Sequence, residues 1–142
     1  YFDLDTLVLG SIRYLCCWVS ISKDAIAMLR GFYKNDHCSG IMAWNRDLSR
    51  LAKGFKTFSE TASWVKQAYG VGCGGFQGDQ DYIRAHLNLM DVPVRPIQDI
   101  QRGVYSYKVH VREKGKVPED ASIVCFHGSP RPWEVEMAEI CQ

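Results

Sequence analysis

The sequence predicts a single mixed α/β domain in which short strands alternate with helices. The chain has 142 residues, of which 46% are apolar and 23% charged, and this fits one domain with its own core. Apolar runs of strand length recur at 26–29 and 123–127, whereas residues 58–69 carry apolar side chains at helical spacing. There is no internal repeat or low-complexity segment, so we expect residues 1–142 to form one unit.

Strands are expected to dominate the first third of the chain. Residues 1–10 are rich in β-forming types and predict a strand. Residues 11–15 predict a short helix, and the apolar run 16–19 predicts a strand after it. Residues 26–29 and 39–44 predict two further strands, the second opened by a turn of small residues.

Helices are expected to follow. Asn45 and Asp47 are potential N-caps for a helix through Phe55, and residues 58–69 predict another helix. The glycine-dense stretch 70–75 lacks the residues of a phosphate-binding loop and predicts a flexible connection at a substrate mouth. The remaining predictions are a helix from Asp79 to Met90, strands over 104–111 and 123–127, a charged loop over 113–120, and a helical tail over 134–142.

Charge, hydropathy and cysteine usage limit the kinds of partner and the cellular compartment that we expect for this protein. A net charge of +1 does not support a nucleic-acid partner held by bulk charge. No apolar run reaches the length of about 18 residues that a membrane span needs, so we expect no span. The six cysteines form no CxxC pair, and the adjacent Cys16 and Cys17 are expected to be buried thiols. We therefore expect a reducing, cytoplasmic setting, with a disulfide framework as the alternative.

Asp3 and Asp5 are the first candidates for chemistry. In an extended run, residues at i and i+2 point to the same side, so both carboxylates would face one way and Leu4 the other. Two hard oxygen ligands at this spacing suit a divalent cation such as Mg²⁺ or Mn²⁺. The alternative is a strand end whose acids face water.

A second group of candidates lies near the end of the chain. The same alternation puts Cys125 and His127 on one side of the last strand, where an imidazole could complete a Mn²⁺ site. Arg131 follows Gly128 by three residues and could hold phosphate oxygens with two bonds. The alternatives are a structural histidine and a solvated turn arginine. Metal ligands, a phosphate-binding arginine and the acid-amide pair Asp79-Gln80 are together typical of a single type of reaction.

Four segments of this sequence resemble a known family. Residues 1–6 (YFDLDT) resemble the DxD strand of glycosyltransferases with the GT-A fold. Residues 126–133 (FHGSPRPW) resemble the closing motif of family-eight enzymes of the glycogenin and bacterial galactosyltransferase type. Residues 38–42 (CSGIM) and 79–81 (DQD) are similar to the family's Asn-Ala/Ser-Gly-Val and Asp-Gln elements. The segments follow the family's order, so the chain resembles the C-terminal portion of such a catalytic domain.

The resemblance implies a fold, a reaction and a cofactor. The expected fold is a GT-A-like nucleotide-diphospho-sugar transferase that lacks its N-terminal nucleotide-binding strands. The expected activity is transfer of a sugar from a nucleotide sugar, expected to be a UDP-sugar, to an acceptor that the sequence does not identify, with retention at the anomeric carbon. The expected cofactor is Mn²⁺, or Mg²⁺.

The resemblance also assigns roles by position. Asp3 and Asp5 would bind metal, Asp3 would also contact the donor, and Arg131 would stand where the family's Lys touches the diphosphate. Gly128 would let the loop close on the diphosphate, and Asp79 and Gln80 would lie near the reacting carbon. The family's metal-binding His falls at Cys125, and its usual Asn at Cys38; His127 is therefore the expected third metal ligand. Further site candidates are Cys125, Ser39, Gly40 and Lys108.

Other functions stay open at this point. A non-catalytic carbohydrate- or partner-binding module would keep the fold without the chemistry. A metal-dependent phosphohydrolase would also use two Asp and one His. Trp44, Tyr105 and Tyr107 are candidates to stack on an acceptor sugar, although strand aromatics more often belong to a core.

Overall fold

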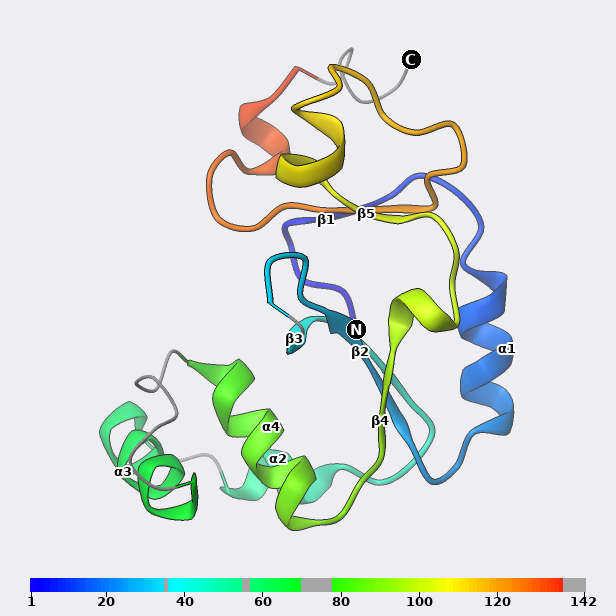
Figure 1. Cartoon of the computed structure of the whole chain (residues 1–142). Coiled ribbons are helices and arrows are strands. Elements are labelled where there is room, and N and C mark those ends of the chain that lie inside the picture. Colours follow the sequence, from blue (N-terminus) through cyan, green and yellow to red (C-terminus); the bar gives the residue numbers. More distant parts are fainter. Residues whose placement is uncertain (35, 55–56, 70–77, 137–142) are drawn as a thin grey trace.

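The computed structural model describes residues 1–34, 36–54, 57–69 and 78–136, and its elements form two three-stranded sheets with helices (Figure 1). The presence of two small sheets together with helices confirms the prediction of a mixed α/β fold. The strand orders are β1-β6-β5 and β3-β2-β4. The elements are β1 (Thr6–Val8), α1 (Arg13–Ile21), β2 (Ile26–Arg30), β3 (His37–Trp44), α2 (Ser49–Gly54), α3 (Phe58–Tyr69), α4 (Asp79–Leu89), β4 (Val94–Pro96), η1 (Ile97–Asp99), β5 (Val104–Ser106), η2 (Tyr107–Val111), β6 (Ile123–Cys125) and η3 (Pro132–Glu134).

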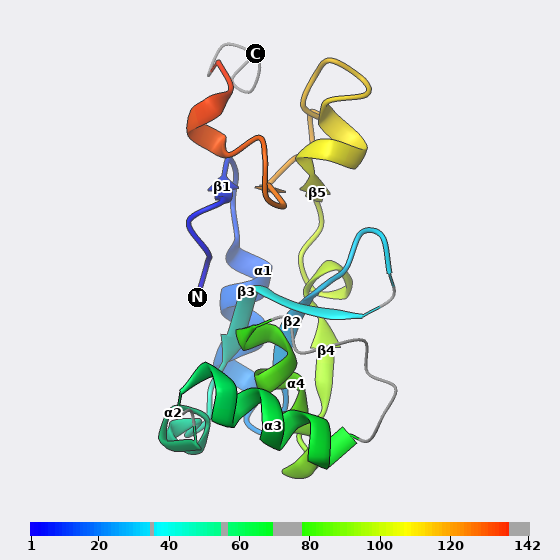
Figure 2. The same ribbon diagram turned by 90° about the vertical axis from the view of Figure 1, so that its left-hand side faces the viewer.

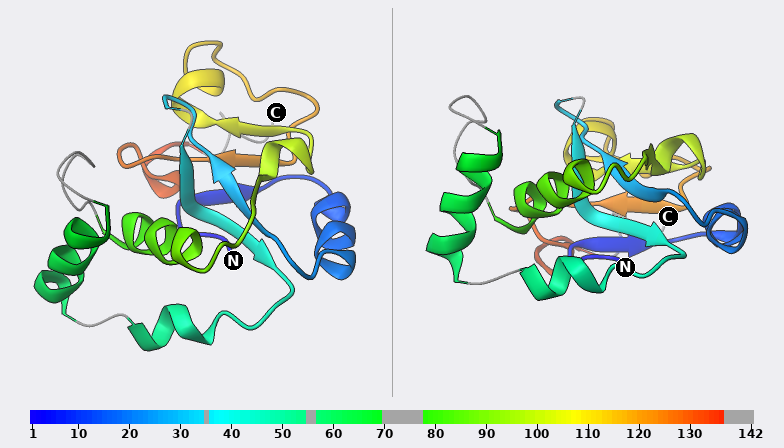
Figure 3. Two further views of the ribbon diagram at one scale, coloured as in Figure 1. Left: turned by 60° about the horizontal axis from the view of Figure 1, so that its bottom comes forward. Right: turned by 90° about the horizontal axis from the view of Figure 1, so that it is seen from below.

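The sheet β3-β2-β4 is covered on both faces, which explains the uninterrupted apolar run 26–29 of its central strand β2. Along β2, Ala27 and Leu29 pack in a cluster with Leu15 of α1. The alternate residues Ile26 and Met28 pack in another cluster with Leu87 of α4. Figure 3 shows α4 lying against this sheet, with α3 beside α4 on the side away from α1.

The second sheet shares a core with the first. Ile123 and Cys125 of β6 and Val104 of β5 belong to the same cluster as Ala27 and Leu29 of β2. On the other face of β6, Val124 packs with Phe126 and with residues of η2. The sheet β1-β6-β5 therefore sits at one end of the first sheet, as Figure 2 shows.

Two strand predictions near the start of the chain are wrong. Only Thr6–Val8 of residues 1–10 form the strand β1, because a turn occupies the residues before it. Residues 16–19 are helical, not extended, since α1 runs from Arg13 to Ile21. Leu15, Trp18 and Val19 pack on the core at helical spacing, whereas Cys16 and Cys17 face outward as exposed free thiols instead of buried ones. The four described cysteines, at 16, 17, 38 and 125, are all free.

The expected strand over 104–111 is also wrong in its second half. Strand β5 ends at Ser106, and residues 107–111 form a π-helical turn, η2. The last strand ends at Cys125, two residues earlier than expected. The expected strands at 26–29 and 39–44 and the helices at 58–69 and 79–90 are present with small changes of boundary.

Helix α2 begins as its capping signal predicted. The Ser49 amide donates to Asp47 Oδ1 at 2.8 Å, which satisfies a backbone donor at the start of the helix. The predicted loop 70–75 and most of the predicted tail 134–142 lie outside the described residues, and Pro132–Glu134 form a short 3-10 turn. Within the described part of the chain, no helix combines the length and apolar character that a bilayer crossing requires.

Candidate functional site

A polar cavity of about 170 Å³ lies where the two sheets meet. It collects side chains from four distant parts of the sequence: the opening turn, the β2–β3 hairpin, the start of α4 and the end of β6. Its lining residues are Asp3, Asp5, Thr6, Leu29, Cys38, Ser39, Gly40, Gln80, Cys125, Phe126 and His127. Most of the candidates named from the sequence therefore share one space.

Asp3 and Asp5 reach the cavity from a turn, not from the expected strand. The Thr6 amide donates to the Asp3 carbonyl at 3.1 Å, and the Leu4 amide donates to Asp3 Oδ1 at 2.8 Å. Short polar side chains that bind the following backbone in this way favour turns over strands. Leu4 points to solvent and is 85% exposed, while both carboxylates line the cavity.

An irregularity in β3 presents Ser39 and Gly40 to the same space. Met28 pairs with Met42, but the next residue, Leu29, pairs with Cys38, so the residues between leave the ladder with β2. The freed Gly40 carbonyl accepts a hydrogen bond from the Asp3 amide at 2.9 Å. Such irregularities redirect side chains and are common beside functional sites.

Asp5 and Arg131 form an ion pair at the edge of the cavity. Arg131 Nη1 donates to Asp5 Oδ2 at 2.7 Å; the Asp5 side chain is 13% exposed and that of Arg131 41% exposed. The Asp5 carbonyl accepts from the Phe126 amide at 2.8 Å, which ties the opening turn to the segment after β6. The candidate phosphate-binding arginine thus lies beside Asp5, one of the two candidate metal-binding acids.

His127 enters the cavity with an unused nitrogen. Its Nε2 is buried and has no hydrogen-bond partner within the described residues. Burial lowers the pKa of His127; the charge of Asp5 opposes this shift and the charge of Lys108 adds to it. A neutral imidazole with a free lone pair is the form that binds metal ions.

Two aromatic residues that the sequence analysis did not select contact His127. The Phe32 and His127 ring centroids are 5.1 Å apart, and the Tyr33 ring lies 6.3 Å from that of His127. Both aromatics follow Gly31 in the hairpin between β2 and β3, and the second strand of this hairpin carries Ser39 and Gly40. Their place in the same hairpin as Ser39 and Gly40 was the signal in the sequence that could have pointed to them.

Lys108 and Gly128 lie together beside His127. A Cβ atom added to Gly128 would be 3.9 Å from Lys108 Nζ, and Gly128 has a positive φ of 72°. A positive φ is unfavourable for residues with a Cβ. Gly128 therefore suits a loop whose backbone must turn sharply next to an ammonium group.

The Asp79-Gln80 pair is divided by the fold. Gln80, in the first turn of α4, lines the cavity. Asp79 is exposed and is absent from the lining; its charge, with those of Asp3 and Asp5, adds to the burial that raises the pKa of the Tyr1 phenol. Asp79 therefore lies close to Tyr1, outside the cavity.

Cys125 and Cys38 line the cavity as protonated thiols. Burial, followed by the charges of Asp5 and Cys38, raises the pKa of Cys125 to about 12. Burial and Asp36 raise the pKa of Cys38 to about 11. Because thiolates are the metal-binding form, both are weaker ligands at neutral pH than His127.

The cavity holds residue types that a hard divalent cation accepts, but within the part of the chain that the structure describes they are not gathered into a metal site. Two carboxylates and an unpartnered imidazole are ligands that Mn²⁺ accepts. Within the described ranges, no three His, Cys, Asp or Glu side chains are gathered closely enough to hold a metal ion, and one Asp5 oxygen is bonded to Arg131.

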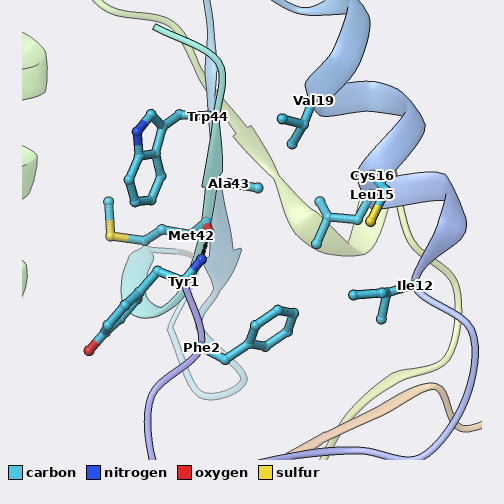
Figure 4. Close-up of a pocket in the computed structure, with 9 residues that line it drawn as sticks. All are labelled: Tyr1, Phe2, Ile12, Leu15, Cys16, Val19, Met42, Ala43 and Trp44. Carbon is cyan, nitrogen blue, oxygen red and sulfur yellow. Dashed lines mark hydrogen bonds between the residues drawn. The ribbon is translucent and has the colours of Figure 1, made fainter. Parts of the chain in front are cut away.

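A second, apolar cavity of about 340 Å³ lies between α1 and β3 (Figure 4). Trp44, a candidate for stacking on a sugar, lines this space with Leu15 and Val19 and does not reach the polar cavity. Tyr107 is buried and stacked on Phe126 with centroids 4.4 Å apart. The Tyr105 hydroxyl donates to Asp120. None of these three aromatics lines the polar cavity.

Comparison with known proteins adds no relative. No protein-family model, no curated protein and no solved structure matches this chain.

Proposed function

We propose that this protein is a metal-dependent glycosyltransferase of the GT-A type, which transfers a sugar from a nucleotide sugar, with UDP-sugar as the leading donor class. One observation carries the proposal. Asp3, Asp5, Gln80 and His127, chosen from segments far apart in the sequence, line one cavity. Arg131, chosen for phosphate binding, lies 2.7 Å from Asp5.

The residues of the cavity suit departure of a diphosphate. Breaking the bond between the anomeric carbon and the phosphate oxygen puts negative charge on the leaving group, and preorganised cationic donors stabilise that charge. Arg131 would donate to the diphosphate oxygens. Gln80 would face the sugar carbon that gains positive character.

Asp3, Asp5 and His127 would hold the cation after closing around it, since these three described side chains are not gathered closely enough to do so in this structure. When bound, Mn²⁺ supplies Lewis-acid stabilisation of phosphate oxygens. His127 is suited to this role because burial lowers its pKa and so favours the neutral imidazole, and because Nε2 has no partner among the described residues. Asp3 is exposed as well as lining the cavity, and it would also contact the donor.

The size of the cavity limits what it would accept. Sites for small ligands usually span about 300–1,000 Å³, whereas this cavity has about 170 Å³. We therefore propose that it takes the sugar and the diphosphate, and that the nucleoside binds outside it.

The test is sugar transfer by matched carboxylate variants. UDP-sugars with different sugars are incubated with the protein, Mn²⁺ and a panel of saccharide acceptors, and transfer and UDP release are measured. Asp5→Asn is expected to lower Mn²⁺-dependent transfer by at least about 100-fold, because even indirect supports of a metal ligand contribute 10- to 100-fold.

The control is Asp24→Asn, an exposed carboxylate outside the cavity lining, which is expected to keep full activity. Unchanged turnover in Asp5→Asn would remove the metal role. Cleavage of phosphate esters that carry no sugar would instead identify a phosphohydrolase.

One observation favours a second candidate, a non-catalytic module that binds a carbohydrate or partner. The bond between Arg131 and Asp5 occupies one of the carboxylates that a metal would need. Titration of UDP with and without Mn²⁺ separates the two functions. Binding that Mn²⁺ strengthens supports the transferase, and saccharide binding without any nucleotide binding supports the module.

A further inference from the structure

Lys108 stands on an unusual element that fixes its position. Residues 107–111 form the π-helical turn η2, a rare conformation that occurs frequently at functional sites. Ser106, which is fully buried, anchors the turn twice. Its Oγ accepts from the Val109 amide at 3.3 Å, and its own amide donates to His110 Nδ1 at 3.0 Å.

The two ends of the turn are held by packing. Tyr107 and Val111 are buried and belong to one cluster with Phe126, the residue immediately before His127. The side chain between these anchors, Lys108, is partly exposed. The turn therefore brings an ammonium group to the segment that lines the cavity with Phe126 and His127.

The ammonium group of Lys108 faces the Gly128 loop. Its Nζ is 3.9 Å from the point where a Gly128 Cβ would lie, and its charge contributes to the lowered pKa of His127. In the described part of the chain, no carboxylate forms an ion pair with Lys108. A partly buried cation without an anionic partner favours binding of an anion.

Lys108 and Arg131 differ in whether they already have an anionic partner. Arg131 already donates to Asp5, so an incoming anion would compete with that carboxylate. Lys108 can bind a phosphate oxygen without breaking an ion pair within the described residues. The absence of a side chain at Gly128 leaves room for the anion next to its backbone.

We propose that Lys108 and the Gly128 loop form a phosphate-binding site next to His127, separate from the Arg131–Asp5 pair. The inference rests on the proposed function for the source of the phosphate, which would be the diphosphate of the nucleotide sugar. Lys108 is then a donor-binding residue that contacts one phosphate group while Arg131 contacts the other.

The test uses inorganic pyrophosphate and UDP as probes, titrated calorimetrically into the protein in the presence of Mn²⁺. Lys108→Met is expected to weaken both affinities about tenfold, the usual size of one lost charge-assisted hydrogen bond, and Lys108→Arg is expected to restore most of the loss. Uridine binding should not change, because the nucleoside carries no phosphate. The matched control is Lys114→Met, which removes an exposed ammonium three residues beyond η2 and should leave both affinities unchanged.

A second measurement needs no variant. Acylation of lysines in the wild-type protein by an amine-reactive reagent is followed by mass spectrometry, and pyrophosphate should protect Lys108 but not Lys114. Equal affinities in Lys108→Met and the wild type, or equal losses in Lys108→Met and Lys114→Met, overturn this inference and leave the proposed function standing. If the wild type binds neither pyrophosphate nor UDP, the phosphate-site inference and the proposed function both fail. If transfer is absent but pyrophosphate binds through Lys108, only the proposed function fails.

Discussion

Several candidate groups converge on Asp5. Its carboxylate bonds to Arg131, its carbonyl accepts from the Phe126 amide, and its charge influences His127 and Cys125. A metal ion and the guanidinium would therefore compete for the same carboxylate. This competition can be measured.

Removing the guanidinium should strengthen metal binding while it weakens the donor site. An ion pair in which one partner is 41% exposed contributes up to about 1 kcal/mol. We therefore expect Arg131→Gln to bind Mn²⁺ up to about fivefold more tightly, as measured by electron paramagnetic resonance titration, and to transfer sugar more slowly. Weaker Mn²⁺ binding in Arg131→Gln than in the wild type would show that Asp5 does not hold the metal.

The cysteines should differ sharply in reactivity. Cys16 and Cys17 are exposed, whereas burial raises the pKa of Cys125 to about 12. Since the thiolate is the nucleophile, iodoacetamide at pH 8 should alkylate Cys16 and Cys17 in the folded protein and leave Cys125 intact until urea is added. Mass spectrometry of digests checks this. Alkylation of Cys125 at the same rate as Cys16 would contradict the buried position.

At the scale of elements, departures from regular structure build the site. The irregular pairing of β3 with β2 presents Ser39 and Gly40, and the turn before β1 presents Asp3 and Asp5. Helix α4 contributes Gln80 at its first turn, and the Arg84 side chain in the same helix bonds to Asp36 at 3.1 Å. That contact joins α4 to the β2–β3 hairpin, and both of these elements contribute residues to the cavity lining.

The pair α3–α4 should be sensitive to acid. His86 lies between Trp64 and Tyr82, with ring centroids 4.4 and 4.3 Å away, and burial lowers its pKa. The unfolded chain binds a proton near pH 6.5, whereas the folded chain does so only at lower pH. Neutral His86 therefore contributes fully to the free energy of unfolding above about pH 6.5. This contribution is lost as the pH falls from the unfolded pKa toward the lower pKa of the folded chain.

Urea unfolding at pH 7.5, 6.5 and 5.5 tests this prediction. We expect the free energy of unfolding to fall with decreasing pH, by at most about 1.4 kcal/mol per pH unit for each proton involved, and to fall less steeply in His86→Phe. Some dependence should remain in the variant, because burial also lowers the pKa of His37 and His127. If the free energy of unfolding falls equally steeply with pH in the wild type and in His86→Phe, His86 is excluded as a source of the pH dependence.

At the scale of the whole molecule, the two sheets depend on one core. Ile123 of β6, Ile41 of β3 and Leu15 of α1 are buried in a single cluster. The cavity lies where these sheets meet, so its geometry depends on their mutual packing. Damage to either sheet should therefore reach the site.

A core variant tests this dependence. Ile123→Ala should lower the free energy of unfolding by about 2–5 kcal/mol, the usual cost of such a truncation. Amide hydrogen exchange should accelerate together at Met28 of β2 and Val124 of β6. Val8→Ala, at a position 48% exposed, is the control and should have little effect. Faster exchange confined to β1, β5 and β6 would indicate two separately folding units.

The sequence by itself determined the fold class and most of the elements that surround the site. Strand β2 and helices α3 and α4 follow directly from local apolar runs and helical spacing, because these signals need no distant partner. Residues 16–19 misled the prediction, since a short apolar run fits a buried helix turn as well as a strand. Alternation over 104–111 misled it in the same way, because burial of Tyr107 and Val111 requires only spacing, not an extended backbone.

Only the tertiary structure decided how the candidate groups meet. Asp5 and Arg131 are 126 positions apart in sequence, and no local periodicity encodes a contact over that separation. The orientation of Asp3 and Asp5 arises from a turn tied to Gly40 and Phe126, not from strand alternation. The place of Lys108 beside Gly128 arises from the packing of η2 on Phe126. The types of residue at the site were therefore readable from the sequence, whereas their geometry came from long-range packing between the two sheets.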